Sequence, residues 1–238
     1  MLSSRIYLIK PIATTRFPLL LPRITALSAH HHHRHFLTTT PAATMSHAAS
    51  ASSDTPNGIS EPVKKDHREL EEYYHKILDA KDEDEKTRWA NQFVWELARH
   101  SVGEELVMYP CMRKALKDGD TIVEKDLREH QEVKEQLFKF QSLDATDRSF
   151  EPLLRTIWTD LAKHMKEEEE SDLVQLEQAL SSEESIDLAK SFQRTKKFVP
   201  TRSHPSAPNQ PPFETVAGLL AAPIDKLRDL FARFPKDD

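Results

Sequence analysis

The sequence contains a single cysteine, Cys111, and only four glycines in 238 residues. One cysteine excludes a disulfide framework and any zinc or iron–sulfur site built from cysteine ligands. So little glycine, with 38% hydrophobic residues, suits one helical domain with appendages rather than two large domains. The longest apolar piece, residues 17–21, is interrupted by Pro18 and is far too short to cross a membrane. We therefore expect no stable membrane span.

Acidic residues are absent from the first 53 positions, which hold five basic residues and are rich in serine and threonine. This composition is typical of a mitochondrial presequence, and residues 5–10 fit a short basic amphipathic helix. The alternative is a leader that is not translated, with the protein beginning at Met45. The expected compartment is accordingly mitochondrial or cytoplasmic. Residues 1–59 are interpreted as a disordered leader and linker, in which the histidines at 30–33 and 35 form a low-complexity tract.

The rest of the chain is acidic. It carries 28 of the 33 Lys and Arg residues and all 39 Asp and Glu residues, so its formal net charge is −11. This balance argues against nucleic acid as the main partner, because binding to phosphates needs an excess of basic side chains.

Helical periodicity dominates from residue 60 to residue 180. Apolar residues at spacings of three and four predict four long helices, which begin near Ser60, Asp84, Thr121 and Asp147 or Ser149. Ser60 is expected to cap the first helix, and Pro110 should end or kink the second. Four helices joined by short loops pack most simply as an up-down four-helix bundle.

Residues 181–238 are expected to form a C-terminal extension. A helix begins at the sequence Ser181-Ser182-Glu183-Glu184 and runs to about residue 197, and five prolines follow within residues 200–212. A last amphipathic helix has a stripe that we expect to pack on the bundle, and its members are Ile224, Leu227, Leu230, Phe231 and Phe234.

Each of the four long helices carries one histidine in its apolar stripe: His67, His100, His130 and His164. Two of these have a glutamate four residues further on, Glu104 and Glu168, so that both side chains share a helix face. Burying such a group without a partner costs about 2–7 kcal/mol. A lone buried histidine is usually a hydrogen-bonded core residue, but one on every helix, together with two carboxylates, indicates a metal site in the bundle core.

Six protein ligands are too many for one ion and suit two metal ions about 3.5 Å apart. In the simplest arrangement Glu104 and Glu168 bridge the ions. The pair His67 and His100 then binds one ion, and the pair His130 and His164 binds the other. Imidazole and carboxylate without thiolate suit iron or manganese, with zinc as a further possibility. This ligand set leaves open positions for water, hydroxide or oxygen.

The chain resembles the hemerythrin-like (HHE cation-binding) domain over about residues 61–180. The resemblance rests on four motifs in order: Asp66-His67-Arg68-Glu69-Leu70, His100 with Glu104, Arg128-Glu129-His130, and His164-Met165-Lys166-Glu167-Glu168. Residues 195–212 are also similar to the tail of fungal members. The resemblance implies a four-helix bundle with a non-haem di-iron centre that binds oxygen or senses iron or redox state.

Two positions depart from the oxygen-carrying hemerythrins. Those proteins have a second histidine four residues after the third-helix ligand, where this chain has Lys134. Their fourth-helix carboxylate lies five residues after its histidine, where this chain has Glu169, with Glu168 at plus four. The missing imidazole argues against reversible oxygen transport and favours oxidation of the iron. Glu168 faces the stripe better and is the predicted ligand, with Glu169 as the alternative.

Three functions are consistent with this pattern. The favoured one is a di-iron protein that binds or senses oxygen, iron or a small reactive ligand such as nitric oxide or peroxide. The second is a di-iron oxidase or peroxidase-like enzyme, although the sequence contains no cofactor motif. The third is a metal-free helical interaction module. Arg99, Glu129 and three tyrosines (Tyr73, Tyr74 and Tyr109) are candidates for contacts to the ligands, and Cys111 lacks an activating partner in the sequence.

Overall fold

The computed structural model describes residues 56–207 and 213–236. All regular elements within these residues are helices, which confirms the all-α fold class. No helix in these two ranges combines the length and the hydropathy that a membrane crossing requires. The predicted leader, its histidine tract and the alternative start at Met45 lie outside the described residues, as does the end of the proline-rich segment.

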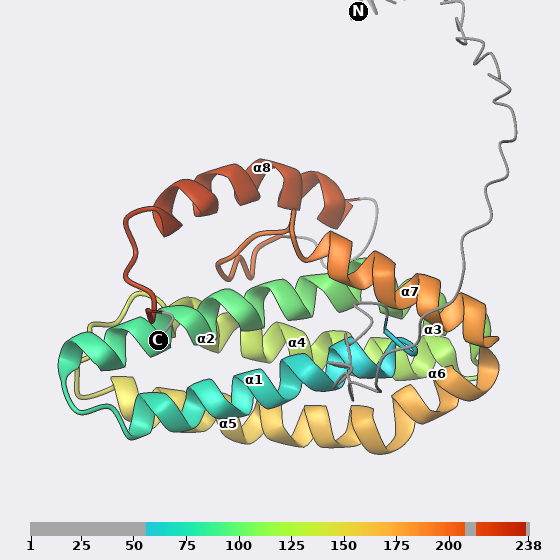
Figure 1. Ribbon diagram of the computed structural model, residues 1–238, viewed down its shortest axis with the longest axis horizontal. Coiled ribbons are helices and arrows are strands. Elements are labelled where there is room, and N and C mark those ends of the chain that lie inside the picture. Colours follow the sequence, from blue (N-terminus) through green and yellow to red (C-terminus); the bar gives the residue numbers. More distant parts are fainter. Residues whose placement is uncertain (1–55, 208–212, 237–238) are drawn as a thin grey trace, which may run out of the picture. The chain divides into compact units, whose positions relative to one another are not determined.

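Four helical segments form the bundle (Figure 1). α1 packs against α2 and α4 packs against α5, while contacts of α1 with α5 and of α2 with α4 complete the bundle. The second and fourth segments are each interrupted by one π-helical turn. In chain order the elements are α1 (Ser60–Leu78), α2 (Glu83–Gly103), a π turn (Glu104–Met108), α3 (Tyr109–Ala115), α4 (Gly119–Phe140), α5 (Phe150–Glu167), a second π turn (Glu168–Asp172) and α6 (Leu173–Ala179).

Pro110 does not end the second segment, which was one of the two predicted outcomes, because helical structure continues through it as α3. In the π turn the Tyr109 N–H bonds to the carbonyl of Glu104, five residues back, so the hydrogen-bond register changes immediately before the proline. Pro110 then falls in the first turn of α3, where a missing N–H costs little.

The structure confirms one predicted helix start and corrects one predicted cap. α7 (Ser182–Thr195) begins where the sequence predicted, and Ser181 and Glu184 form a reciprocal capping box there. Ser60 is not the cap of α1, because Ile59 holds that position and has no side-chain oxygen to offer. The Glu177 carboxylate of α6 accepts a hydrogen bond of 2.9 Å from the Ser60 N–H instead.

Two apolar clusters divide the bundle interior, and a polar layer lies between them. One cluster includes Leu70 and Val133, and the other includes Val63 and Leu127. His67 follows Val63 and precedes Leu70 along α1, so it falls at the boundary of the two clusters. The same holds on α4, where His130 stands between Leu127 and Val133. The packing therefore places the histidines at one level of the bundle.

The C-terminal extension lies against the bundle. α7 contacts α1, α2 and the first π turn, and α8 (Phe213–Asp229) follows further along the chain (Figure 1). His204 Nε2 lies 2.8 Å from Asp225 Oδ2, and the Thr201 hydroxyl donates to Asp229 Oδ2 at 2.7 Å. These contacts hold α8 to the segment that precedes it.

The predicted packing of the C-terminal apolar stripe, which begins in α8 and continues past its end, is wrong. Ile224, Leu227, Leu230 and Phe231 are 58–83% exposed, and Phe234 alone among the five is partly covered, with its ring 6.5 Å from that of Trp95. The inward face carries Ala222 and Asp225 instead. The physical reason is that two acids in the last turns of α8, Asp225 and Asp229, find hydrogen-bond partners at residues 201–204, which fixes the rotation of the helix.

Candidate metal centre

The six predicted ligands meet in the polar layer of the bundle. Their side chains are at most 5% exposed, and each helical segment supplies at least one. His67 and His100 have ring centroids 4.9 Å apart, and His130 and His164 have centroids 4.8 Å apart. The structure therefore brings the four histidines together as the two pairs that the sequence predicted.

Glu104 stands between the two histidine pairs. Its Oε1 lies 3.0 Å from His100 Nε2, and its Oε2 lies 3.4 Å from His130 Nε2. Potential ligand atoms of His67, His100, Glu104 and Glu168 all lie within 4.8 Å of one another, and so do those of Glu104, His130 and His164. Glu104 is the member common to both groups, which is the placement expected of a bridging carboxylate.

Glu168 is less symmetric in its contacts. Its Oε2 lies 3.2 Å from His67 Nε2, and its side chain is 1% exposed. Glu169 points elsewhere: its Oε1 lies 2.8 Å from the other ring nitrogen of His67, Nδ1, and its carboxylate also accepts from Arg68. The plus-four glutamate therefore faces the interior, and the plus-five glutamate orients a histidine from behind.

Several atoms at the centre lack hydrogen-bond partners although they are buried. They are Nε2 of His67 and His100 and both carboxylate oxygens of Glu104 and of Glu168. The short distances between these groups do not have hydrogen-bond geometry. Buried polar atoms are normally paired, and leaving them unpaired costs about 1–3 kcal/mol each. Convergent nitrogen and oxygen atoms of this kind fit a bound cation, so the donor set passes this test for a metal.

Each histidine is held from behind by a carboxylate of a neighbouring helical segment. The Nδ1 atoms of the four rings lie 2.8–3.1 Å from carboxylate oxygens, and the pairs are His67 with Glu169, His100 with Asp66, His130 with Glu105, and His164 with Glu129. Such a partner fixes the tautomer and leaves Nε2 facing the metal position. Of these four acids, only Glu129 and Glu169 were predicted from the sequence to lie near the ligands.

The four pairs follow the bundle in a closed circuit. Asp66 of α1 holds a histidine of α2, Glu105 of the first π turn holds one of α4, Glu129 of α4 holds one of α5, and Glu169 of the second π turn holds one of α1. Every one of these acids is adjacent in sequence to a predicted ligand. That adjacency is the sequence signal that could have identified them, but it does not say which histidine each acid contacts.

Basic side chains neutralise the outer carboxylates. Arg68 Nη2 donates to both oxygens of Glu169 at 2.5 and 2.6 Å, and Lys134 pairs with Glu105. Lys125 and Lys163 each lie 3.6 Å from Glu129, and Lys196 pairs with Asp66. Lys134, which occupies the position of the missing histidine, therefore serves a carboxylate that orients His130.

The electrostatics of the cluster follow from burial and its acidic neighbours. Burial by itself lowers the pKa of His100, but Glu104 and Asp66 outweigh it and raise that pKa to about 10. Burial also lowers the pKa of His164, and Glu129, Glu168 and Glu104 raise it to about 9. Burial raises the pKa of Glu168, yet His67, His164 and His100 bring it down to about 2. Without metal, the imidazoles of His100 and His164 thus stay protonated at neutral pH and balance part of the carboxylate charge.

Tyr109 reaches the cluster because of the first π turn. Its hydroxyl lies 2.9 Å from His130 Nε2, and its side chain is 1% exposed. The residue is five positions after Glu104, a spacing that would leave the shared face in a regular α-helix. Burial, with nearby carboxylates, raises the pKa of Tyr109 well above its usual value, so the phenol stays protonated.

The other residues singled out in the sequence make their contacts outside the cluster. Tyr74 stacks on Trp158 with ring centroids 4.5 Å apart, and Tyr73 stacks on Trp89. Burial raises the pKa of Cys111, so its thiol is not activated. Arg99 lies over the Trp95 ring and pairs with Glu96.

Comparisons with known proteins agree with this geometry. The model of the hemerythrin HHE cation binding domain matches residues 58–176. A hemerythrin-like protein of Schizosaccharomyces pombe is 59% identical over 178 residues, which are 74% of this chain and 88% of that protein. A DNA nickase of Nostoc sp. is 24% identical over 144 residues, which are 60% of this chain and 40% of that protein.

No solved structure matches the chain. The family model covers half of the chain, and its region contains the whole ligand cluster. The chain therefore belongs to the hemerythrin HHE cation binding domain family.

Proposed function

We propose that this protein binds two iron ions in the bundle core and uses them to bind or sense oxygen or another small reactive ligand. The observation that carries the proposal is the set of buried ligand atoms without partners, contributed by His67, His100, Glu104 and Glu168. His130 and His164 complete the proposed ligand set on the other side of Glu104. Membership in a cation-binding family supports the same conclusion.

Two features support two ions rather than one. The potential ligand atoms divide into two groups that share Glu104, and the two oxygens of Glu104 approach different histidine pairs. The absence of cysteine from the cluster favours iron or manganese over metals that prefer thiolates, with zinc again as a further possibility. Two iron ions would supply electrons to oxygen or peroxide, and the role of the surrounding residues is to hold and orient them.

Lys134 bears on the choice between oxygen transport and oxidation. Its Nζ is engaged by Glu105, so it does not replace the imidazole of the oxygen carriers as a ligand. With six ligands for two ions, positions stay open to water or a small ligand. This supports a reactive or sensing centre over reversible oxygen transport.

The test is the metal content of the full chain, expressed in iron-replete cells without an affinity tag, together with its absorption spectrum in air and after reduction. We expect about two irons per chain and near-ultraviolet bands that bleach on reduction. The control is His100→Ala combined with Glu104→Ala, which keeps the leader histidines and should lose the bands. A single zinc, or iron that survives in the control, would contradict the proposal.

The same centre also supports a second function, a di-iron oxidase or peroxidase. The observation that favours it is the replacement of one expected imidazole by Lys134. Repeated turnover with peroxide or ferrous iron, lost in His100→Ala, would establish the enzyme. A single stoichiometric oxidation would favour binding or sensing.

A metal-free interaction module makes an opposite prediction. If the four histidines were only structural, replacing all of them with apolar residues would keep or raise the melting temperature and leave metal content unchanged. We expect that quadruple variant to lose the metal.

A further inference from the structure

One of the basic partners of the histidine–carboxylate pairs comes from outside the bundle. Arg68, Lys125, Lys134 and Lys163 all belong to the bundle helices α1, α4 and α5. Lys196 instead follows α7, beyond the region that the family model covers. The extension therefore supplies the cation that neutralises Asp66, the carboxylate behind His100.

Lys196 is buried and has two acidic partners. Its Nζ pairs with Asp66 Oδ2 and with Glu96 Oε1, and its side chain is 8% exposed. The same oxygen of Asp66 lies 3.1 Å from His100 Nδ1. Lys196, Asp66 and His100 thus form a continuous chain that ends at the ring whose Nε2 faces Glu104.

The site needs a cation at this point. Carboxylate oxygens of Asp66, Glu69 and Glu96 lie within 4.8 Å of one another. Without a positive charge between them, Asp66 would be repelled from its neighbours and would find better solvation away from His100.

The backbone at Lys196 is also held by contacts with α2. Arg99 Nε donates to the carbonyl oxygen of Lys196 at 2.9 Å. One turn earlier, Phe192 is fully buried and its ring lies 6.1 Å from that of His100. A Cβ added to Gly103 would come within 2.9 Å of the Phe192 ring and 3.2 Å of Lys196 Cγ. The end of α2 thus lacks a side chain at the point where α7 approaches.

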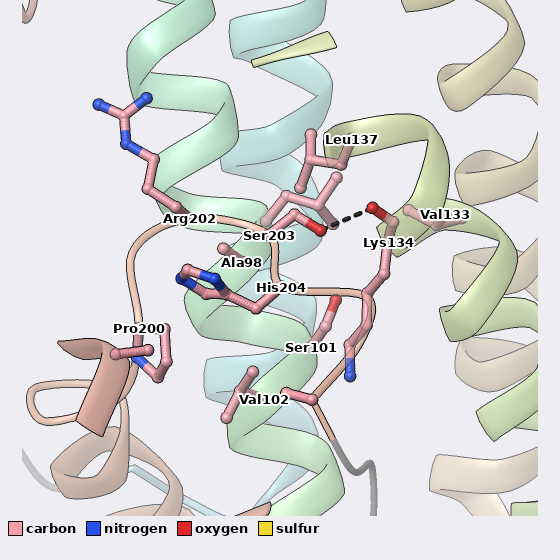
Figure 2. Close-up of a pocket in the computed structure, with 13 residues that line it drawn as sticks. Ala98, Ser101, Val102, Val133, Lys134, Leu137, Pro200, Arg202, Ser203 and His204 are labelled. Atoms are coloured by element: carbon pink, nitrogen blue, oxygen red, sulfur yellow. Dashed lines mark hydrogen bonds between the residues drawn. The ribbon is translucent and has the colours of Figure 1, made fainter. Parts of the chain in front are cut away.

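A second contact of the extension reaches the other histidine pair. Ser203 Oγ donates to the carbonyl oxygen of Lys134 at 2.6 Å, and Figure 2 shows this bond at the edge of a pocket between residues 200–204 and the helices α2 and α4. Lys134 in turn pairs with Glu105, which orients His130. The extension is therefore connected to the cluster at two places, and the contact of Lys196 is the more direct one.

We propose that Lys196 is a positioning residue of the metal centre: through Asp66 it fixes the ring of His100, and it thereby makes the C-terminal extension part of the site. The proposal rests on the proposed function for its metal readout, and its geometric part has a readout of its own. Lys196 acts as a fixed internal cation and does not itself bind metal.

The test compares Lys196→Met and Lys196→Gln with Lys196→Arg in the full chain. Loss of a side chain that orients a metal-binding histidine typically lowers metal affinity by about 10- to 100-fold. Lys196 acts one contact further out, through Asp66, so in chelator competition we expect a loss near the lower end of that range, about 10-fold, for the Met and Gln variants and a smaller one for Arg, which keeps the charge. The absorption bands of the loaded protein should shift in the first two variants.

The matched control is Arg202→Met. Arg202 is also a largely buried cation of the extension, with a side chain 12% exposed, but it pairs with Asp229 of α8 and not with a carboxylate of the cluster. It should lower the melting temperature and leave metal affinity and spectrum unchanged. Equal losses of affinity in Arg202→Met and Lys196→Met would overturn the proposal, because the effect would then be one of general stability.

A measurement on metal-free protein tests the positioning role of Lys196 independently of the proposed iron binding. The Nδ1 proton of His100 should give a protected, downfield NMR signal because it is bonded to Asp66, and Lys196→Gln should weaken that protection while Arg202→Met does not. If wild-type protein binds no iron but the signal behaves as expected, the proposed function fails and the positioning role stands. An unchanged signal in Lys196→Gln would refute the positioning role whatever the metal content.

Discussion

Asp66 is the neighbour of His67 in the chain, but its carboxylate lies 3.1 Å from Nδ1 of His100 on the next helix. The same displacement by one helix recurs for the other three carboxylates of the circuit. Each helical segment thus helps to orient the histidine of its neighbour. A change in the docking of any one helix would disturb two histidines of the cluster, one on the helix itself and one on the next.

Removing one carboxylate of the circuit should weaken metal binding without unfolding the bundle. Glu129 is the most solvent-accessible of the four, with a side chain 23% exposed, and it holds His164 at 3.0 Å. We expect Glu129→Gln to lower metal affinity by about 10- to 100-fold. Chelator competition measures the affinity, and Glu132→Gln, an exposed change on the same helix, is the control. Equal affinities in the two variants would contradict the role of the circuit.

The two glutamates of the cluster should differ in their effect on metal stoichiometry. Glu104 belongs to both groups of potential ligands, whereas Glu168 belongs to the one that contains His67 and His100. We expect Glu104→Ala to lose both ions and Glu168→Ala to keep about one per chain, held by the remaining group. Elemental analysis after dialysis gives the count. If both variants lose both ions, Glu168 bridges as fully as Glu104.

The stability of the metal-free protein should fall in alkaline solution. The pKa values of His100 and His164 are raised from 6.5 to about 10 and about 9, so their stabilising contribution is complete below pH 6.5 and is lost as the pH rises through 9–10. The slope is limited to about 1.4 kcal/mol per pH unit for each proton. Denaturant unfolding at pH 7, 8.5 and 10 measures the free energy of unfolding and hence this slope.

The pH dependence of stability should be measured on the metal-loaded protein as well, for comparison with the metal-free protein. Metal binds the neutral imidazole, so the loaded chain should show a smaller alkaline loss. On the acidic side the sign reverses, because the pKa values of Asp66 and Glu168 are lowered to about 2 and their contribution disappears as the pH falls toward that value. A flat profile of the metal-free protein between pH 7 and 10 would contradict the charge state described here.

The exposed stripe of α8 should tolerate substitution, unlike the buried face of α7. Leu227 and Leu230 are 58% and 78% exposed, so changing both to serine should cost less than about 0.5 kcal/mol each. Phe192→Ala should cost about 3–5 kcal/mol, since the ring is fully buried beside the cluster. Unfolding free energies of the variants test the difference. A large loss in the serine variants would mean that the stripe packs on the bundle after all.

The helical bundle and the clustering of the six predicted ligands were accessible from the sequence because both depend on spacing within one helix. His100 with Glu104 and His164 with Glu168 are separated by four residues on regular α-helix, and each pair ends where a π turn begins. Tyr109 lies past such a turn, so a spacing of 3.6 residues placed it off the ligand face. The carboxylate circuit depends on how helices rotate against one another, and one sequence does not give that rotation.

For the C-terminal helix, the sequence predicted the helix but not its packing. The stripe of Ile224, Leu227 and Leu230 is clearly amphipathic, but periodicity reports the faces of a helix and not what covers them. Here Asp225 and Asp229 decide the orientation, because they bond to His204 and Thr201 in the segment before the helix. Those two partners are on an irregular segment, which a helical pattern does not describe.

The two π turns set the rotation of the helical residues that follow them. Each adds one residue to a helical turn directly after a ligand, so the helix continues rotated by about 100° relative to a regular path. Shortening Glu104–Met108 by one residue would restore that path and swing Tyr109 and everything after it away from its present neighbours, while His100 and Glu104 stayed in place. The length of each π turn therefore decides which residues beyond it face the cluster, and Tyr109 against His130 is the example at the first turn.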